Sequence, residues 1–165
     1  MYPAYIEAMK TKFCFDGNKP AAQRPRWMIV DDNEDILWVL RHLAAQISGA
    51  DITCFLSPCE ALAAFTAAPE SFELVVTDLE MPGMSGIELC ERLHALLPAA
   101  KILLTTGSEI ITDAEARDKG FCGLLHKPFA IETLQNTLEA VGVGTTSEHF
   151  SEATAAFMFT KGAFA

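Results

Sequence analysis

The chain has 165 residues, half of them apolar (50%), and its formal net charge of −10 gives a pI of about 4.7. This length suits one domain with room for terminal extensions. The charge argues against nucleic acid as a direct partner, because phosphate contacts need clustered Lys and Arg and no basic run occurs. We also expect no signal peptide and no membrane span, since no stretch approaches the roughly 18 consecutive apolar residues that a span requires.

Five cysteines are widely spaced in the chain and form no CxxC pair. Most of them lie inside apolar runs, which predicts buried free thiols rather than disulfides. Free thiols are typical of a reducing compartment, so we expect a cytoplasmic protein. The five are Cys14, Cys54, Cys59, Cys90 and Cys122.

Short apolar runs alternate with segments whose apolar residues recur at helical spacing. The runs, each a predicted strand, occupy residues 27–30, 52–55, 74–77, 102–104 and 123–125. The predicted helices follow them in order and reach Leu43, Phe65, Leu96, Lys119 and Val141. Continuous apolar strands that alternate with helices are typical of a parallel sheet covered on both faces. The predicted fold class is therefore α/β, within a core domain over residues 26–142.

Local signals indicate where several of the predicted helices begin and end. Either Asp32 or Asn33 can cap the first helix. Residues 57–60 and 85–88 both read as capping boxes, the former with proline at the first helical position. Gly142 follows the last helix as a stop signal.

Polar side chains follow four of the predicted strands, at the point where each strand ends. Because the carboxyl ends of parallel strands share one edge, where ligands bind in open α/β sheets, these side chains should lie together. Two carboxylates about 4 Å apart repel by roughly 4 kcal/mol at an effective dielectric near 20, so the acids need a counter-ion. A hard divalent cation such as Mg²⁺ fits oxygen ligands of this kind. The residues are Asp31, Asp32, Asp78, Thr106 and Lys127.

This set of side chains suits phosphoryl chemistry, although each member alone has an ordinary structural role. Asp78 could attack phosphorus and form an acyl phosphate, or it could cap the turn that follows. The acid pair at 31–32 could hold the cation, or one of its members could simply cap a helix. Thr106 and Lys127 could contact phosphoryl oxygens, or they could be a structural strand end and a solvated turn residue. The signals gain weight jointly, because each falls at the end of a predicted strand.

Four stretches of this sequence together resemble the receiver domain of bacterial two-component response regulators. The resemblance covers nearly all of the predicted core, and it implies a flavodoxin-like (βα)5 three-layer sandwich. That fold has a five-stranded parallel sheet with strand order 2-1-3-4-5. The matching stretches are residues 29–34, 75–86, 103–107 and 127–129.

The resemblance also implies a function, in which Asp78 accepts a phosphoryl group from a histidine kinase or histidine phosphotransfer protein. Thr106 and Lys127 would contact the phosphoryl oxygens, and the Lys127–Pro128 peptide is expected to be cis. The chain would not be an enzyme with a separate substrate, but a signalling domain that assists its own phosphorylation and dephosphorylation. Around Mg²⁺ the resemblance places Asp31, Asp32, Asp78 and the backbone carbonyl of Glu80.

The sequence departs from the family pattern at one position and lacks a recognisable output domain. Leu124 stands where the family usually has the aromatic residue that moves on activation. Residues 1–25 are expected to form an N-terminal extension, and residues 143–165 a C-terminal tail too short for an output domain. We therefore expect a stand-alone receiver that signals by protein–protein contact with a target the sequence does not identify, and dimerisation through the tail is an open alternative.

Two other functions compete with phosphate acceptance. Leu124 and the unusual tails favour an interaction module that works without phosphorylation, whereas the intact site residues oppose that reading. A phosphatase with an aspartyl nucleophile, similar to haloacid dehalogenases, would need a second Asp two residues after the first. Glu80 occupies that position, so this alternative is disfavoured.

Overall fold

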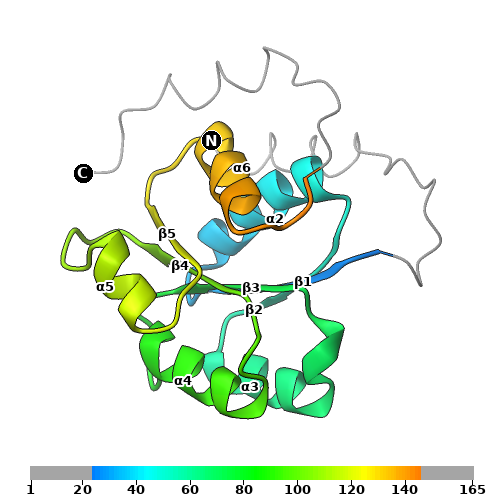
Figure 1. The fold of residues 1–165 in the computed structure, drawn as a ribbon, viewed down its shortest axis with the longest axis vertical. Helices are drawn as coiled ribbons and strands as arrows, with labels where there is room; N and C mark the ends of the chain where they lie inside the picture. The colour runs from blue at the N-terminus through cyan, green and yellow to red at the C-terminus, as the bar shows by residue number, and fades with distance from the viewer. Residues whose placement is uncertain (1–23, 146–165) are drawn as a thin grey trace.

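The computed structural model describes residues 24–145, in which five parallel strands form one sheet between two layers of helices (Figure 1). The strands are β1 (Arg26–Val30), β2 (Asp51–Phe55), β3 (Leu74–Asp78), β4 (Ile102–Thr106) and β5 (Gly123–His126). The helices are α2 (Glu34–Ser48), α3 (Pro58–Ala67), the short 3-10 helix η2 (Pro69–Ser71), α4 (Gly86–Leu96), α5 (Asp113–Asp118) and α6 (Ile131–Ala140). The sheet order β2-β1-β3-β4-β5 confirms the predicted flavodoxin-like topology.

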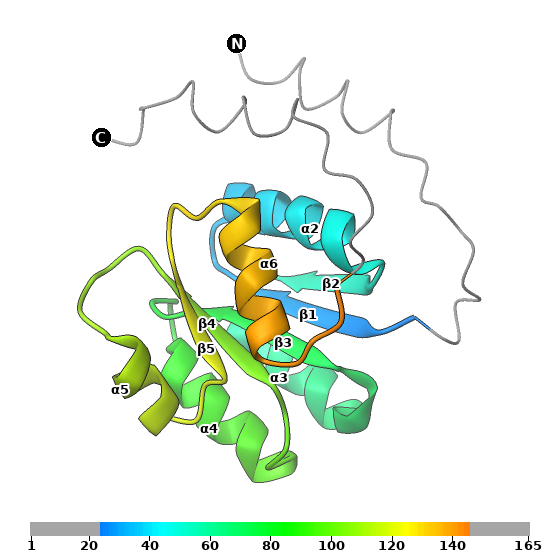
Figure 2. The same cartoon turned by 45° about the horizontal axis from the view of Figure 1, so that its top comes forward.

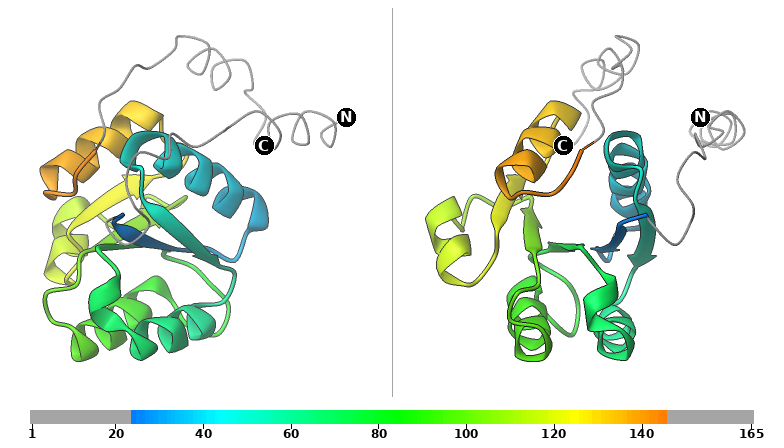
Figure 3. Two further views of the ribbon diagram at one scale, coloured as in Figure 1. Left: turned by 90° about the vertical axis from the view of Figure 1, so that its right-hand side faces the viewer. Right: turned by 45° about the vertical axis from the view of Figure 1, so that its right-hand side comes forward.

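The two faces of the sheet each pack against their own helices. Helices α2 and α6 cover one face, and α3, α4 and α5 cover the other (Figures 2 and 3). Along β1, Trp27 and Ile29 belong to the cluster under α2 and α6, while Met28 and Val30 belong to the opposite cluster. Because neighbouring side chains enter two different cores, the strand is apolar at nearly every position.

Three helix starts test the capping signals in the sequence. Asn33, not Asp32, caps α2, since its side-chain oxygen accepts from the backbone N–H groups of residues 35 and 36. The box between Ser85 and Glu88 at the start of α4 is confirmed. The box predicted for residues 57–60 is wrong, because the Ser57 side chain makes no capping hydrogen bond to α3. The proline at the first helical position already fixes the local backbone and removes one N–H that would need a partner.

Local caps set the bounds of the last two helices. Helix α5 is shorter than the predicted segment 111–119, because Thr112 caps it in a box with Glu115 that the apolar pattern does not reveal. Ile111 is buried just before this cap rather than inside the helix. Helix α6 ends as predicted, since Gly142 adopts a left-handed φ of 68° and lets Val143 N–H reach back to the helix.

The predicted extension and tail lie almost wholly outside the described residues, as does Cys14. The division of the chain into extension, core and tail therefore stays a prediction. The four described cysteines are free thiols, as expected, but of these only Cys90 is buried, while Cys54 and Cys122 are half-buried and Cys59 is exposed. No helix within residues 24–145 is long and apolar enough to cross a membrane.

Candidate functional site

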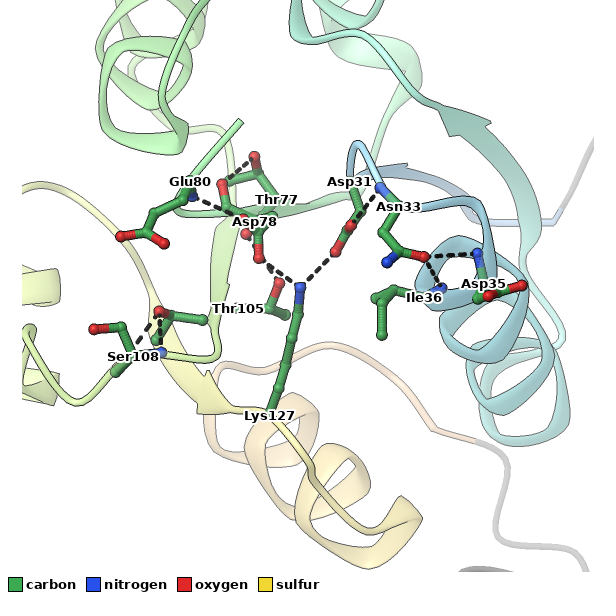
Figure 4. A network of polar contacts seen from close by, with 11 residues as sticks. Asp31, Asn33, Asp35, Ile36, Thr77, Asp78, Glu80, Thr105, Ser108 and Lys127 are labelled. Atoms are coloured by element: carbon green, nitrogen blue, oxygen red, sulfur yellow. Dashed lines mark hydrogen bonds and ion pairs between the residues drawn. The ribbon is translucent and has the colours of Figure 1, made fainter. Parts of the chain in front are cut away.

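The predicted site residues Asp31, Asp78 and Lys127 lie together at the edge of the sheet formed by the carboxyl ends of β1, β3, β4 and β5 (Figure 4). Asp31 follows β1 directly, and Lys127 follows β5. Asp78 and Thr106 are the last residues of β3 and β4, so both strands extend further than the apolar runs predict. Parallel pairing with matched registers carries these positions to the same edge.

A single ammonium group lies between two buried carboxylates (Figure 4). Lys127 Nζ donates to Asp31 Oδ2 and to Asp78 Oδ1, both at 2.5 Å. The side chains of Asp31, Asp78 and Lys127 are 2%, 10% and 17% exposed. Since two charges of the same sign repel strongly at low dielectric, the shared cation offsets the repulsion between the two carboxylates at this edge.

The second oxygen of each carboxylate is held by a backbone amide two residues further along the chain. Asn33 N–H donates to Asp31 Oδ1 at 2.9 Å, and Glu80 N–H donates to Asp78 Oδ2 at 2.7 Å. Each carboxylate therefore has one partner from its own loop and one from Lys127. These bonds fix the orientation of both side chains, because rotation of either carboxylate would break a charge-assisted hydrogen bond.

Burial and pairing shift the pKa values of the site in defined directions. Burial raises the pKa of Asp31 above its ordinary 3.8, and the bonds from Lys127 and Asn33 offset this only in part. For Lys127, burial disfavours the charged form, but hydrogen bonds to Asp31 and Asp78 outweigh burial and raise its pKa above 10.5. The upward pKa shifts of Asp31 and Lys127 are consistent with each other. The Lys127 ammonium is stabilised by two carboxylates, whereas Asp31 shares that one ammonium with Asp78. Lys127 is therefore a permanent cation at neutral pH.

The remaining residues of the predicted metal site are solvent-exposed. The side chains of Asp32 and Glu80 are both exposed. Within the described part of the chain, no three His, Cys, Asp or Glu side chains are grouped as a ready-made metal centre. The structure thus brings Asp31 and Asp78 together but not Asp32, whose role as a ligand stays a prediction.

The donor set nevertheless fits the chemistry of Mg²⁺. Carboxylates and a backbone carbonyl offer only oxygen atoms, which a hard cation prefers, and Mg²⁺ keeps several waters in place of further protein ligands. The two buried carboxylates share a single positive charge between them, so a second cation would be attracted to this edge. Asp31, Asp32, Asp78 and the carbonyl of Glu80 are the residues that would hold it.

The hydroxyl of Thr106 is engaged in its own loop rather than with the carboxylates. It accepts from Ser108 N–H at 3.0 Å and donates to the Ser108 carbonyl at 3.4 Å. Thr106 nevertheless pairs with His126, the residue before Lys127, so the strand end is where the prediction puts it. A contact with a phosphoryl group would require this hydroxyl to leave Ser108.

Sequence reasoning missed two contributors to the site. Asn33 was considered only as a helix cap, yet its backbone N–H also holds Asp31. Thr77 was counted only as the end of a strand, yet its hydroxyl donates to the backbone carbonyl of Asp78 at 3.1 Å. The Asp-x-Asn spacing at 31–33 is a signal for the first, because such a short side chain commonly accepts from an N–H two residues on. The lone hydroxyl in an apolar strand is the signal for the second.

Two expectations near Lys127 concern its strand and the following peptide. The Lys127–Pro128 peptide bond is cis, as expected. Leu124 is half-buried and packs against the cluster under α3, α4 and α5. A leucine there fills the space with aliphatic carbon and has neither a ring face nor a hydroxyl to offer.

Comparisons with known proteins agree with this site. The sequence model of the response regulator receiver domain matches residues 27–139. The chain belongs to this family. The receiver domain resembles the DNA-binding transcriptional regulator NtrC of Salmonella typhimurium, at 35% identity over 115 residues, covering 67% of this chain and 23% of that protein. It also resembles the C4-dicarboxylate transport regulator DctD of Rhizobium meliloti, at 31% identity, covering 67% of this chain and 24% of that protein.

The receiver domain thus spans about a quarter of the length of these curated relatives. Among solved structures it matches chemotaxis protein CheY4 of Vibrio cholerae with a TM-score of 0.63 and 28% identity, covering 72% of this chain and 98% of that one. The shared fold and family establish a signalling domain of two-component systems.

Proposed function

We propose that this receiver domain accepts a phosphoryl group on Asp78 from a histidine kinase or histidine phosphotransfer protein. The observation that carries the proposal is the Asp78 carboxylate, which ends a central strand and is held by Lys127 and by the Glu80 amide. A carboxylate fixed in this way presents its oxygen lone pairs to the sheet edge instead of rotating freely. Such preorientation favours nucleophilic attack, because less ordering remains to be done in the transition state.

The transfer step exchanges one bond to phosphorus for another. An oxygen of Asp78 bonds to phosphorus while the bond from phosphorus to the donor imidazole nitrogen breaks, and that electron pair stays on the nitrogen. Lys127 remains charged throughout and can donate to an oxygen of the incoming group. Thr106 can add a second donor once its hydroxyl turns from Ser108. Bound Mg²⁺ would supply positive charge that neutralises the phosphoryl oxygens.

The test is an intact-mass assay with acetyl phosphate and Mg²⁺, followed by a phosphorylated histidine phosphotransfer protein as donor. The wild-type chain should gain one phosphoryl group, and Asp78→Asn should gain none. Asp113→Asn, which changes an exposed acid on α5, is the matched control and should behave as wild type. Absence of any adduct with both donors, or equal labelling of Asp78→Asn, contradicts the proposal.

Output by contact with a protein target is a second part of the proposal, and Leu124 motivates an alternative. A domain without the usual aromatic residue could bind its partner regardless of phosphorylation. Beryllofluoride distinguishes the two, since it mimics the phosphoryl group on an aspartate. Partner affinity that rises with beryllofluoride supports signalling by phosphorylation, whereas affinity that does not change supports the phosphorylation-independent module.

A further inference from the structure

The backbone carbonyl of Asp78 has two close neighbours. Thr77, which is fully buried, donates its hydroxyl to this oxygen at 3.1 Å (Figure 4). The second neighbour is Gly86, the first residue of α4. A Cβ added at Gly86 would lie 2.1 Å from the Asp78 carbonyl oxygen and 3.0 Å from its carbonyl carbon. The helix can therefore approach the end of β3 this closely only because residue 86 has no side chain.

This contact fixes the peptide group that joins the acceptor to the following loop. Gly86 N–H donates to the Leu79 carbonyl at 3.0 Å, so the start of α4 is bonded to the residue after Asp78. The next residue is Glu80, whose N–H holds Asp78 Oδ2 and whose carbonyl is a predicted metal ligand. A rotation of the 78–79 peptide would therefore move both of these groups relative to the acceptor carboxylate.

The neighbouring glycines show that this role is particular to Gly86. Gly83 lies in the same loop with a φ of 81°, and a Cβ there would meet nothing within 4 Å. Gly83 is thus needed for its backbone conformation, not for a close approach. Gly107, beside Thr106, also has open space around it. Among the glycines that the structure describes, only Gly86 touches the backbone of Asp78.

We infer that Thr77 and Gly86 are positioning residues, which together hold the Asp78 carbonyl in place and so set where Glu80 meets the acceptor carboxylate. Neither residue touches the phosphoryl group. Their effect reaches the chemistry through the Glu80 amide and carbonyl. This inference rests on the proposed function of Asp78 as acceptor, and it adds the reason why α4 begins with glycine.

The decisive variant is Thr77→Val, which keeps the shape of the side chain and removes only the hydroxyl. The first readout is hydrogen exchange of the Glu80 amide in metal-free protein, where loss of the clamp should speed exchange about 10-fold relative to global opening. The second is the affinity for Mg²⁺ alone, which should fall about 10-fold, as is typical when the support of a ligand is removed. Gly86→Ala should change both readouts in the same direction and by more.

Two control variants separate positioning from a general loss of stability. Thr105→Val removes another buried hydroxyl that donates to a backbone carbonyl, that of Thr77 at 3.3 Å, one strand away. Gly83→Ala strains the same loop without filling the contact. Both should lower stability while leaving Glu80 exchange, corrected for global opening, and Mg²⁺ affinity near wild type.

The inference is overturned if Thr77→Val and Thr105→Val change the two readouts equally. It is also overturned if Gly86→Ala folds and leaves both readouts at wild-type values. Should Gly86→Ala fail to fold, Thr77→Val still decides the matter. Neither readout needs a phosphodonor. If Asp78 fails to take a phosphoryl group, the proposed function is contradicted, but the positioning role of Thr77 and Gly86 can still be tested.

Discussion

The carboxylate half of the site and its hydroxyl half are held in different ways. In the first, Asp31 and Asp78 from two strands share the ammonium of Lys127 from a third. In the second, the hydroxyl of Thr106 bonds to Ser108, two residues away in the same loop. The difference teaches that long-range ion pairs hold the proposed acceptor in place before any ligand binds, whereas the Thr106 hydroxyl would have to turn from Ser108 to reach a ligand.

The largest test of this comparison is removal of the shared ammonium. Lys127→Met leaves two buried carboxylates without their cation, so the free energy of unfolding in metal-free buffer should fall by about 3–5 kcal/mol. Mg²⁺ should restore part of this loss. Urea denaturation with and without Mg²⁺ measures both effects.

Lys101→Met is the matched control, because the Lys101 ammonium donates to the backbone carbonyl of Gly142, which is a neutral partner. Its loss should cost about 1 kcal/mol. Equal losses for Lys127→Met and Lys101→Met would mean that the carboxylate half does not depend on its ammonium.

Substitution of Thr106 in the hydroxyl half should change the rate of phosphorylation rather than the free energy of unfolding. Thr106→Ala removes a donor that is needed only when the phosphoryl group is present, so transfer to Asp78 should slow about 100-fold. Its unfolding free energy should change by no more than about 1 kcal/mol. Thr106→Ser keeps the hydroxyl and should retain most of the rate. Stopped-flow phosphorylation measures the rates, and a strongly destabilised but fully active Thr106→Ala would contradict the comparison.

Substitutions of the adjacent acids Asp31 and Asp32 test the carboxylate half of the site in more detail. Asp31→Asn disturbs a buried ion pair, so it should cost about 1–3 kcal/mol even without metal. Asp32→Asn changes an exposed residue and should stay within about 0.5 kcal/mol. Both should weaken the rise in melting temperature that Mg²⁺ produces, since binding to the native state alone raises stability. An unchanged Mg²⁺ response in Asp32→Asn would remove Asp32 from the predicted ligands.

The smallest expected effect is a pH dependence of the stability of α4 and α5, the helices that follow β3 and β4. Glu88 at the start of α4 and Glu115 at the start of α5 accept hydrogen bonds from the backbone and hydroxyl of their caps, which lower the pKa of each below 4.5. Their stabilising contribution is complete above pH 4.5, and it is lost as the pH falls through the lowered folded-state value.

Replacing either glutamate with Gln should therefore flatten the fall in stability between about pH 5 and pH 3. Helix α5 buries only Ala116, whereas α4 buries several residues, so protonation of Glu115 should loosen its helix locally before global unfolding. Circular dichroism and amide exchange across this pH range would show the order of loss.

Much of the fold followed from the sequence, because strands with both faces buried are continuous apolar runs. Trp27 to Val30 illustrate this, since alternate residues enter opposite cores. The first residue of α5 could not be predicted from the pattern of apolar residues. Ile111 matches the helical spacing, yet it is buried ahead of the Thr112 cap. Apolar periodicity reports burial, and a buried loop residue next to a helix satisfies it equally well.

The site was predictable where topology decides and unpredictable where local partners compete. Asp31, Asp78 and Lys127 converge because parallel strands end at one edge. The sequence gives no means to foresee that Lys127 would bond to both acids, since that follows from two buried carboxylates competing for the nearest cation. The orientation of the Thr106 hydroxyl is set by its hydrogen bond with Ser108. Residue spacing does not reveal which of the nearby groups the hydroxyl bonds.

The ammonium shared by Asp31 and Asp78 affects how the stability of the domain depends on magnesium. An acidic pocket that relied wholly on a divalent ion would unfold whenever the supply of that ion fell. With a lysine from its own chain in place, the protein can persist intact through a shortage of magnesium. Fluctuating magnesium would then govern how readily the domain takes up a signal, while the amount of folded protein stays constant.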